Sequence, residues 1–85
     1  MPYIKQSKRK KYERVLKNIL EIDNKGDLEF CVSYLMKIFM KNRDFRYSTL
    51  HDCTYAVQHC ADEFRRLNLD KREDEAREKN GEIQL

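Results

Sequence analysis

Basic and aromatic residues occur together at three places along the chain, where they could hold an anionic partner. These places are the first residues, the stretch between the second and third expected helices, and the end of the third. The candidate ligand-binding residues are Tyr3, Lys5, Lys8, Arg9, Tyr12, Arg43, Arg46, Tyr47, Arg65 and Arg66. Guanidinium forks hold phosphate with two hydrogen bonds and aromatic faces stack on bases, so convergence of these segments would make a nucleotide site. The alternative for each residue is a solvated side chain that pairs with Asp or Glu.

The histidines form no recognisable catalytic or metal-binding motif. His51 and His59 would lie about 12 Å apart along one helix, so they cannot share an ion within it. His59 and Glu63 have a spacing that suits a metal but is more often a surface hydrogen bond. The chain has no G-x-S-x-G elbow, no P-loop and no H-E-x-x-H motif. We therefore expect a binding protein with no catalytic residues, no metal site and no cofactor.

The three cysteines, Cys31, Cys53 and Cys60, form no C-x-x-C pair. Their number and spacing fit neither a disulfide framework nor a zinc knuckle. Cys53 and Cys60 fall on an apolar helical stripe, where a thiol behaves as a small hydrophobic group. We interpret them as structural, with a catalytic thiol as the weaker alternative.

The net charge of +3 is distributed unevenly. Residues 1–18 have a local balance of +6, whereas residues 61–85 have a balance of −2. A basic first segment can attract phosphates or the acidic end of a second subunit. The chain contains neither an apolar run of the roughly 18 residues that span a bilayer nor a signal-peptide pattern at its start. We expect a cytoplasmic protein without membrane contact.

The first helix should follow an extended arm formed by residues 1–7. Its apolar face is given by Tyr12, Val15, Leu16, Ile19 and Leu20. This spacing predicts a helix from about Ser7 to Ile22, with Ser7 as the N-cap. The polar residues that follow, 23–26, are typical of a turn.

The second helix should begin at an Asp27 cap and end at residues 41–44. One face carries Leu28, Cys31, Val32, Leu35 and Phe39. Phe30, Tyr34 and Ile38 add a second apolar face. A helix that is apolar over so much of its circumference needs more than one partner. We therefore expect it to be central, with Phe30, Tyr34 and Ile38 in a contact between subunits.

The third helix has the clearest apolar seam, and Ser48 or Thr49 is its expected cap. The seam consists of Leu50, Cys53, Val57, Cys60, Phe64 and Leu67. Residues 71–79 contain helix formers without an apolar face and can extend the rod as far as the Asn80-Gly81 pair, which is a good helix end.

These elements predict one all-α domain of 85 residues, a small antiparallel three-helix arrangement with a charged C-terminal extension, residues 71–85. A chain of this size is marginal as a monomer, so we also expect a homo-oligomer. The expected core is Val15, Ile19, Leu28, Val32, Leu35, Phe39, Leu50, Val57, Cys60 and Phe64.

Both termini carry the most specific residues of the chain. It opens Met1-Pro2-Tyr3-Ile4, contains Gly26-Asp27-Leu28-Glu29-Phe30, and closes with Glu73-Asp74 and Asn80-Gly81-Glu82-Ile83. This framework resembles a family of small uncharacterised proteins of phages and bacteria that begin Met-Pro-Tyr-Ile and end Tyr-Glu-Asp, a spacer and Asn-Gly-Asp. The chain departs from that pattern at Arg72, which replaces the tyrosine, and at Glu82, which replaces the final aspartate.

The stretch Glu63-Phe64 followed by Arg66 is similar to the family's Glu-Phe-Tyr-Arg-Arg, with Arg65 in place of the tyrosine and Leu67 in place of the second arginine. The phage association implies a sponge that sequesters a nucleotide signal of host defence, without changing it. Two alternatives remain. A small basic nucleic-acid-binding protein would bind many sequences and lose affinity with salt. An inhibitor of a host protein would ignore small anions.

Overall fold

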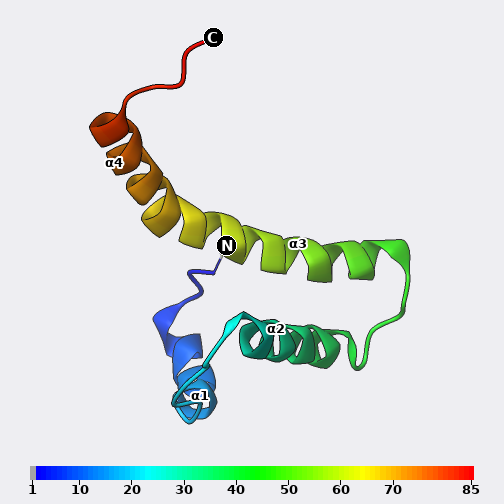
Figure 1. Ribbon diagram of the computed structural model, residues 1–85. Helices are drawn as coiled ribbons and strands as arrows, with labels where there is room; N and C mark the ends of the chain where they lie inside the picture. Colours follow the sequence, from blue (N-terminus) through cyan, green and yellow to red (C-terminus); the bar gives the residue numbers. More distant parts are fainter. Residues whose placement is uncertain (1) are drawn as a thin grey trace.

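The computed structural model describes residues 2–85, and its described part is helical without a strand (Figure 1). The elements are α1 (Gln6–Leu16), α2 (Lys25–Met40), α3 (Tyr47–Phe64), a short π-helix η1 (Arg65–Leu69) and α4 (Asp70–Asn80). The all-α class predicted from the sequence is thus confirmed. Of the four residues of the Met-Pro-Tyr-Ile start, Met1 lies outside the described part.

Helix α1 begins earlier and ends much earlier than predicted. Lys5, not Ser7, occupies the N-cap position, and no side chain caps this end. The helix stops at Leu16 rather than Ile22, with the Asn18 N–H bonded to the Val15 carbonyl in a closing turn. No other helix in the described part of the chain packs against α1. Further turns would therefore gain no packing energy, and helix propensity alone is too weak to sustain them.

Helix α2 begins two residues before the predicted cap. Asn24 is the N-cap, and its Oδ1 accepts the Asp27 N–H at 2.9 Å. Asp27 instead lies inside the first turn, where its negative charge is favourable next to the helix N-terminus. Either residue could have capped the helix, but the extended backbone of Asn24 suits the N-cap position.

Helix α3 has no side-chain cap, so the caps predicted at Ser48 and Thr49 are wrong. Arg46 holds the N-cap position in an extended conformation, and α3 begins one residue later. The Thr49 hydroxyl instead donates back to the Arg46 carbonyl at 3.0 Å. The hydroxyl therefore bonds to the loop and does not accept a hydrogen bond from a free N–H of the first turn of α3.

Helices α3, η1 and α4 form one bent rod, so the predicted extension over residues 71–79 is helical (Figure 1). The wide turn of η1 has a local cause. Asn68 Nδ2 donates to the Phe64 carbonyl at 3.0 Å, and so competes with the backbone for that acceptor. The Asp70 N–H bonds to the Arg65 carbonyl, one residue further back than in an α-helix. Gly81 ends α4 with a φ of 92°, a region that glycine tolerates.

Helices α2 and α3 lie side by side and run in opposite directions (Figure 1). Met40 on α2 and Cys53 on α3 are the two buried hydrophobic residues of the described chain, at 6% and 5% exposure. The Cys53 Sγ lies 3.8 Å from the Met36 carbonyl oxygen and binds it weakly. This pair of helices forms a single layer with no second layer over it.

The predicted core is mostly wrong for the single chain. Val32, Phe39 and Val57 are half-buried. The other predicted core residues are exposed, namely Val15, Ile19, Leu28, Leu35, Leu50, Cys60 and Phe64. The periodicity correctly identified the apolar faces of α2 and α3. A single pair of helices can bury only the residues between them, so the rest of these faces stays exposed.

Candidate functional site

The N-terminal arm meets the end of α3 through three polar side chains. Arg66 Nε donates to Glu63 Oε1 at 2.6 Å, and the Tyr3 hydroxyl lies close enough to the same carboxylate for each group to affect the pKa of the other. The hydrogen bond from Arg66 is the main cause that lowers the pKa of Glu63 and raises that of Arg66. The pKa of Tyr3 is raised by desolvation and by the Glu63 carboxylate. Glu63 therefore lies between Tyr3 of the arm and Arg66 of its own rod.

Arg9 completes the attachment of the arm. Its Nε donates to the Ile4 carbonyl at 2.8 Å, and the residue is half-buried. Its positive charge also acts on Tyr3, as does that of Arg66. Three of the ten candidates thus lie near one another: Tyr3 and Arg66 beside the Glu63 carboxylate, which already neutralises the charge of Arg66, and Arg9 near Tyr3.

A cavity of about 570 Å³ opens beside this attachment. Its lining residues are Pro2, His59, Asp62, Glu63, Arg65, Arg66 and Asp70. Two arginines face three carboxylates there, so with neutral histidine the lining carries a net charge of −1. A phosphate could enter only if an arginine left its carboxylate partner.

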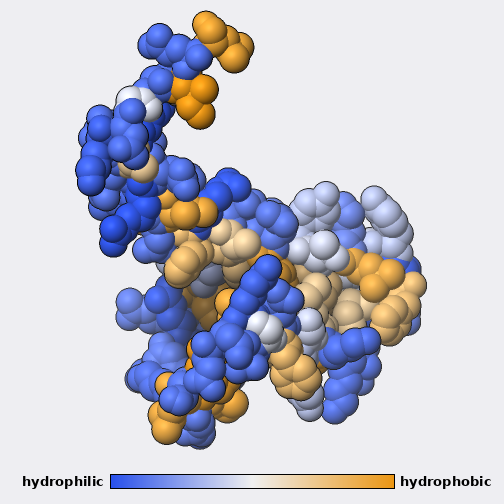
Figure 2. Space-filling model, in the orientation of Figure 1, coloured by the Kyte–Doolittle hydropathy of each residue, from blue (hydrophilic) through white to orange (hydrophobic). Residues whose placement is uncertain are grey.

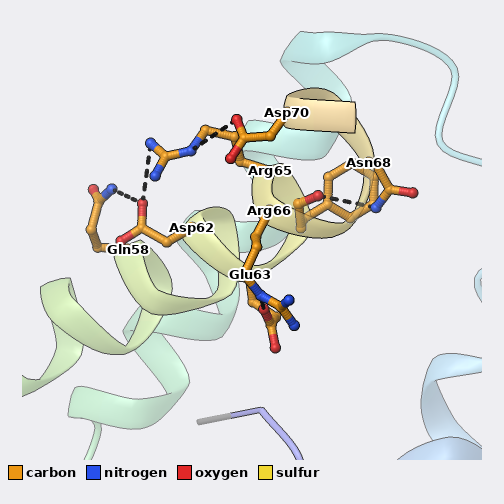
Figure 3. Close-up of polar contacts among 8 residues, drawn as sticks. Gln58, Asp62, Glu63, Arg65, Arg66, Asn68 and Asp70 are labelled. Atoms are coloured by element: carbon orange, nitrogen blue, oxygen red, sulfur yellow. Dashed lines mark hydrogen bonds and ion pairs between the residues drawn. The ribbon is translucent and has the colours of Figure 1, made fainter. Parts of the chain in front are cut away.

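The two arginines of this cavity differ in how firmly they are held (Figure 3). Arg65 lies between Asp62 at 3.7 Å and Asp70 at 3.8 Å, and its side chain is 56% exposed. Arg66 makes its short bond to Glu63, whose side chain is only 18% exposed. Long, exposed ion pairs contribute little to stability, so Arg65 can turn to another anion at low cost.

A column of four aromatic rings runs along α3 and ends at this cavity. It consists of Tyr47, His51, Tyr55 and His59, all exposed. The ring centroids of successive members lie 5.3, 4.1 and 6.3 Å apart. We call these four residues the aromatic column. Aromatic faces of this kind stack on nucleobases.

Of the aromatic column, only Tyr47 is among the ligand-binding residues predicted from the sequence. His51 and His59 entered the predictions only as possible metal ligands, and Tyr55 did not enter them. A regular spacing of four residues between aromatic rings was the available signal, because such residues are neighbours on a helix surface. In the described residues, no group of three or more potential ligands could hold a metal ion.

The candidates in the second loop lie at the other end of α3. The Arg43 guanidinium sits 3.8 Å from the centroid of the Phe39 ring, and Arg46 pairs with Asp44 at 3.0 Å. Some 18 residues separate Tyr47 from Arg65, which is about 27 Å of helix. One small ligand therefore cannot touch both groups within a single chain.

The remaining candidates lie on the arm and α1. Lys5, Lys8 and Tyr12 are exposed. The Lys11 ammonium lies 4.9 Å from the centroid of the Tyr12 ring, a cation–π contact on the helix surface. These residues make α1 a basic helix but do not line the cavity beside Glu63.

The chain belongs to a family described as a domain of unknown function, DUF6899, which matches residues 1–83. No curated protein and no solved structure matches it. No helix of the described part is long and apolar enough to cross a membrane.

Proposed function

We propose that this member of a family of unknown function is a non-catalytic protein that binds a phosphorylated nucleotide. The observation that carries the proposal is the aromatic column, which leads from the second loop to the cavity beside Arg65. A base would stack on His59 and Tyr55, and a phosphate would be held by Arg65 after it leaves Asp62 and Asp70. Arg66 would remain on Glu63 and keep the arm in place.

The resemblance to a family of phages and bacteria suggests the biological role of the proposed binding. The family that this chain resembles in its Met-Pro-Tyr-Ile start and its Glu-Asp and Asn-Gly residues occurs in phages and bacteria, and a phage-encoded member would act in the host cytoplasm. Binding without turnover would make it a sponge that removes a nucleotide signal of host defence. Cyclic and linear nucleotides share the base and phosphate chemistry that the site recognises.

A thermal-shift screen against cyclic and linear nucleotides tests the proposal. Ligand at 100 times its dissociation constant should stabilise the fold by about 2.7 kcal/mol, which is several degrees for a domain of this size. Arg65→Ala should abolish the shift and leave the ligand-free melting temperature nearly unchanged, because its ion pairs are long and exposed. Arg14→Ala removes an arginine from exposed α1 and serves as the matched control, which should keep the shift.

Chromatography of the nucleotide after incubation provides the second readout. The ligand should be recovered unchanged, and a hydrolysed product would contradict the non-catalytic part. If no nucleotide shifts the melting temperature of the wild-type protein, the proposal is wrong.

A nucleic-acid-binding function is the second candidate, and the same column favours it. Its ring centroids follow one another at 4.1 to 6.3 Å along α3, so several bases of a single strand could stack on the exposed faces of the column. The basic residues of α1 would then contact phosphates. Affinity for single-stranded DNA should in that case fall steeply with salt, and should fall equally for different sequences.

A further inference from the structure

An uncovered apolar groove runs between α2 and α3. It has a volume of about 330 Å³ and no charged residue in its lining. Residues from both helices form it, including Val32, Leu35, Phe39, Ala56, Val57 and Cys60. Five of these six are residues that the sequence predicts for the core. The groove is therefore half of a hydrophobic core, open on the side where a second layer would lie.

The chain exposes more surface than a compact monomer, to which both the projecting α4 and the uncovered groove contribute. The exposed surface is 8473 Å², whereas a compact monomer of 10.4 kDa exposes about 5,400 Å². The radius of gyration is 17.1 Å, against about 12 Å for a compact chain of 85 residues. The excess area is larger than the roughly 800 Å² that each partner buries in a standard interface.

Hydrophobic side chains supply part of this excess. In Figure 2, hydrophobic residues are exposed among hydrophilic ones over the part of the molecule that α1, α2 and α3 form, whereas α4 is almost wholly hydrophilic. Large apolar residues on both α2 and α3 are half exposed or more, among them Leu35 and Phe64. Single exposed hydrophobic residues are normal, but a contiguous apolar groove indicates an interface.

We propose that a second copy of this chain covers the groove, so that two α2–α3 pairs form a symmetric four-helix bundle. Helices α2 and α3 are 16 and 18 residues long, about 24 and 27 Å. The four helices of two such pairs are therefore similar in length, as a bundle requires. A two-fold axis brings each groove onto its copy, and the uncharged lining creates no repulsion between like charges. Antiparallel pairs with one apolar face are the units from which such bundles are built.

This assembly uses a different face of α2 from the one that the sequence suggested. Phe30, Tyr34 and Ile38 form the second apolar face, and all three are more than half exposed. The groove is favoured because both helices contribute to it, so its closure completes a core on α2 and α3 at once. The inference does not depend on the proposed nucleotide.

Light scattering coupled to size-exclusion chromatography tests the assembly. The mass should be twice the 10.4 kDa of one chain at micromolar concentration. Leu35→Glu places a charge in the groove and should raise the dissociation constant at least about tenfold. Tyr34→Glu, on the other apolar face, is the matched control and should leave the dimer intact. A species of one chain at all concentrations overturns the inference, and so does dissociation by Tyr34→Glu alone.

Thiol labelling of the wild-type protein gives an answer even if Leu35→Glu fails to fold. Cys60 lines the groove and is exposed in the single chain, whereas Cys31 is half-buried and does not line the groove. Brief maleimide treatment followed by mass spectrometry of peptides should show that Cys60 labels more slowly as concentration rises. Cys31 should label at the same rate throughout. Equal labelling of Cys60 in the dilute and the assembled protein contradicts a covered groove.

Discussion

At the scale of single residues, Glu63 is the group at the end of α3 that Tyr3 of the N-terminal arm approaches. The pKa of Glu63 lies below its ordinary value of 4.5, chiefly through the Arg66 hydrogen bond and to a smaller extent through Tyr3, so the stabilisation from these contacts is complete above 4.5 and is lost as the pH falls through the lowered value. The pKa of Tyr3 is raised above 10.0, so its contribution is lost only as the pH rises through that raised value. The arm should therefore stay attached at neutral pH and detach in acid.

The Tyr3 ring resonances in an NMR titration report this detachment. Glu63→Gln keeps the size of the side chain but removes the charge, so the acid transition should disappear. Glu13→Gln, which removes the partner of Lys17 on α1, should leave it unchanged. An acid transition of the same midpoint in Glu63→Gln would show that another group controls the arm.

The sequence identified the residue types of the site but not their partners. Arg65 and Arg66 line the cavity, yet each is paired with carboxylates from neighbouring turns of the same rod. The attachment of Tyr3 to Glu63 joins residues 60 positions apart, which no local spacing encodes. The aromatic column on α3, by contrast, could be predicted from the sequence, because its four aromatic residues are spaced by four.

At the scale of elements, the start of α2 depends on one side chain. Asn24→Ala removes the acceptor for the Asp27 N–H and should lower the free energy of unfolding by about 1 kcal/mol. Ser7→Ala is the informative control, because the sequence predicts a cap there and the structure has none. Urea denaturation at one fixed protein concentration measures both. Equal losses for the two variants would contradict the assigned caps.

The extent of each helix was predictable where packing and periodicity agree. Helices α2 and α3 pack together, and their apolar stripes gave their positions to within a few residues. Helix α1 was predicted too long because its apolar stripe continues to Ile22, while no other helix of the described residues packs on it. The wide turn of η1 was not predictable from periodicity, since it follows from the Asn68 side chain taking a backbone acceptor.

At the scale of the whole molecule, the predicted core and the observed exposure are reconciled by assembly. Val32, Leu35, Phe39 and Val57 were chosen because a folded protein must bury them, and they do line one groove. The sequence pattern cannot tell whether the covering layer comes from the same chain or from another. In the described part of this chain α1, which would form the second layer of a monomer, packs on no other helix.

Val57→Asp tests whether the fold itself depends on this covering. In the single chain Val57 is only half-buried, so a carboxylate could stay hydrated and the helices would survive. In the proposed dimer the same carboxylate would be buried without a partner, at a cost of several kcal/mol against a total stability of roughly 5 to 10. We therefore expect the variant to lose its helical circular dichroism and its dimeric mass together. Val15→Asp, on exposed α1, should keep both.

The wild-type melting temperature should also rise with protein concentration, because folding and association are then one equilibrium. A Val57→Asp protein that keeps its helicity and melting temperature, beside a wild-type protein whose melting temperature ignores dilution, would show that α2 and α3 are stable without a second copy.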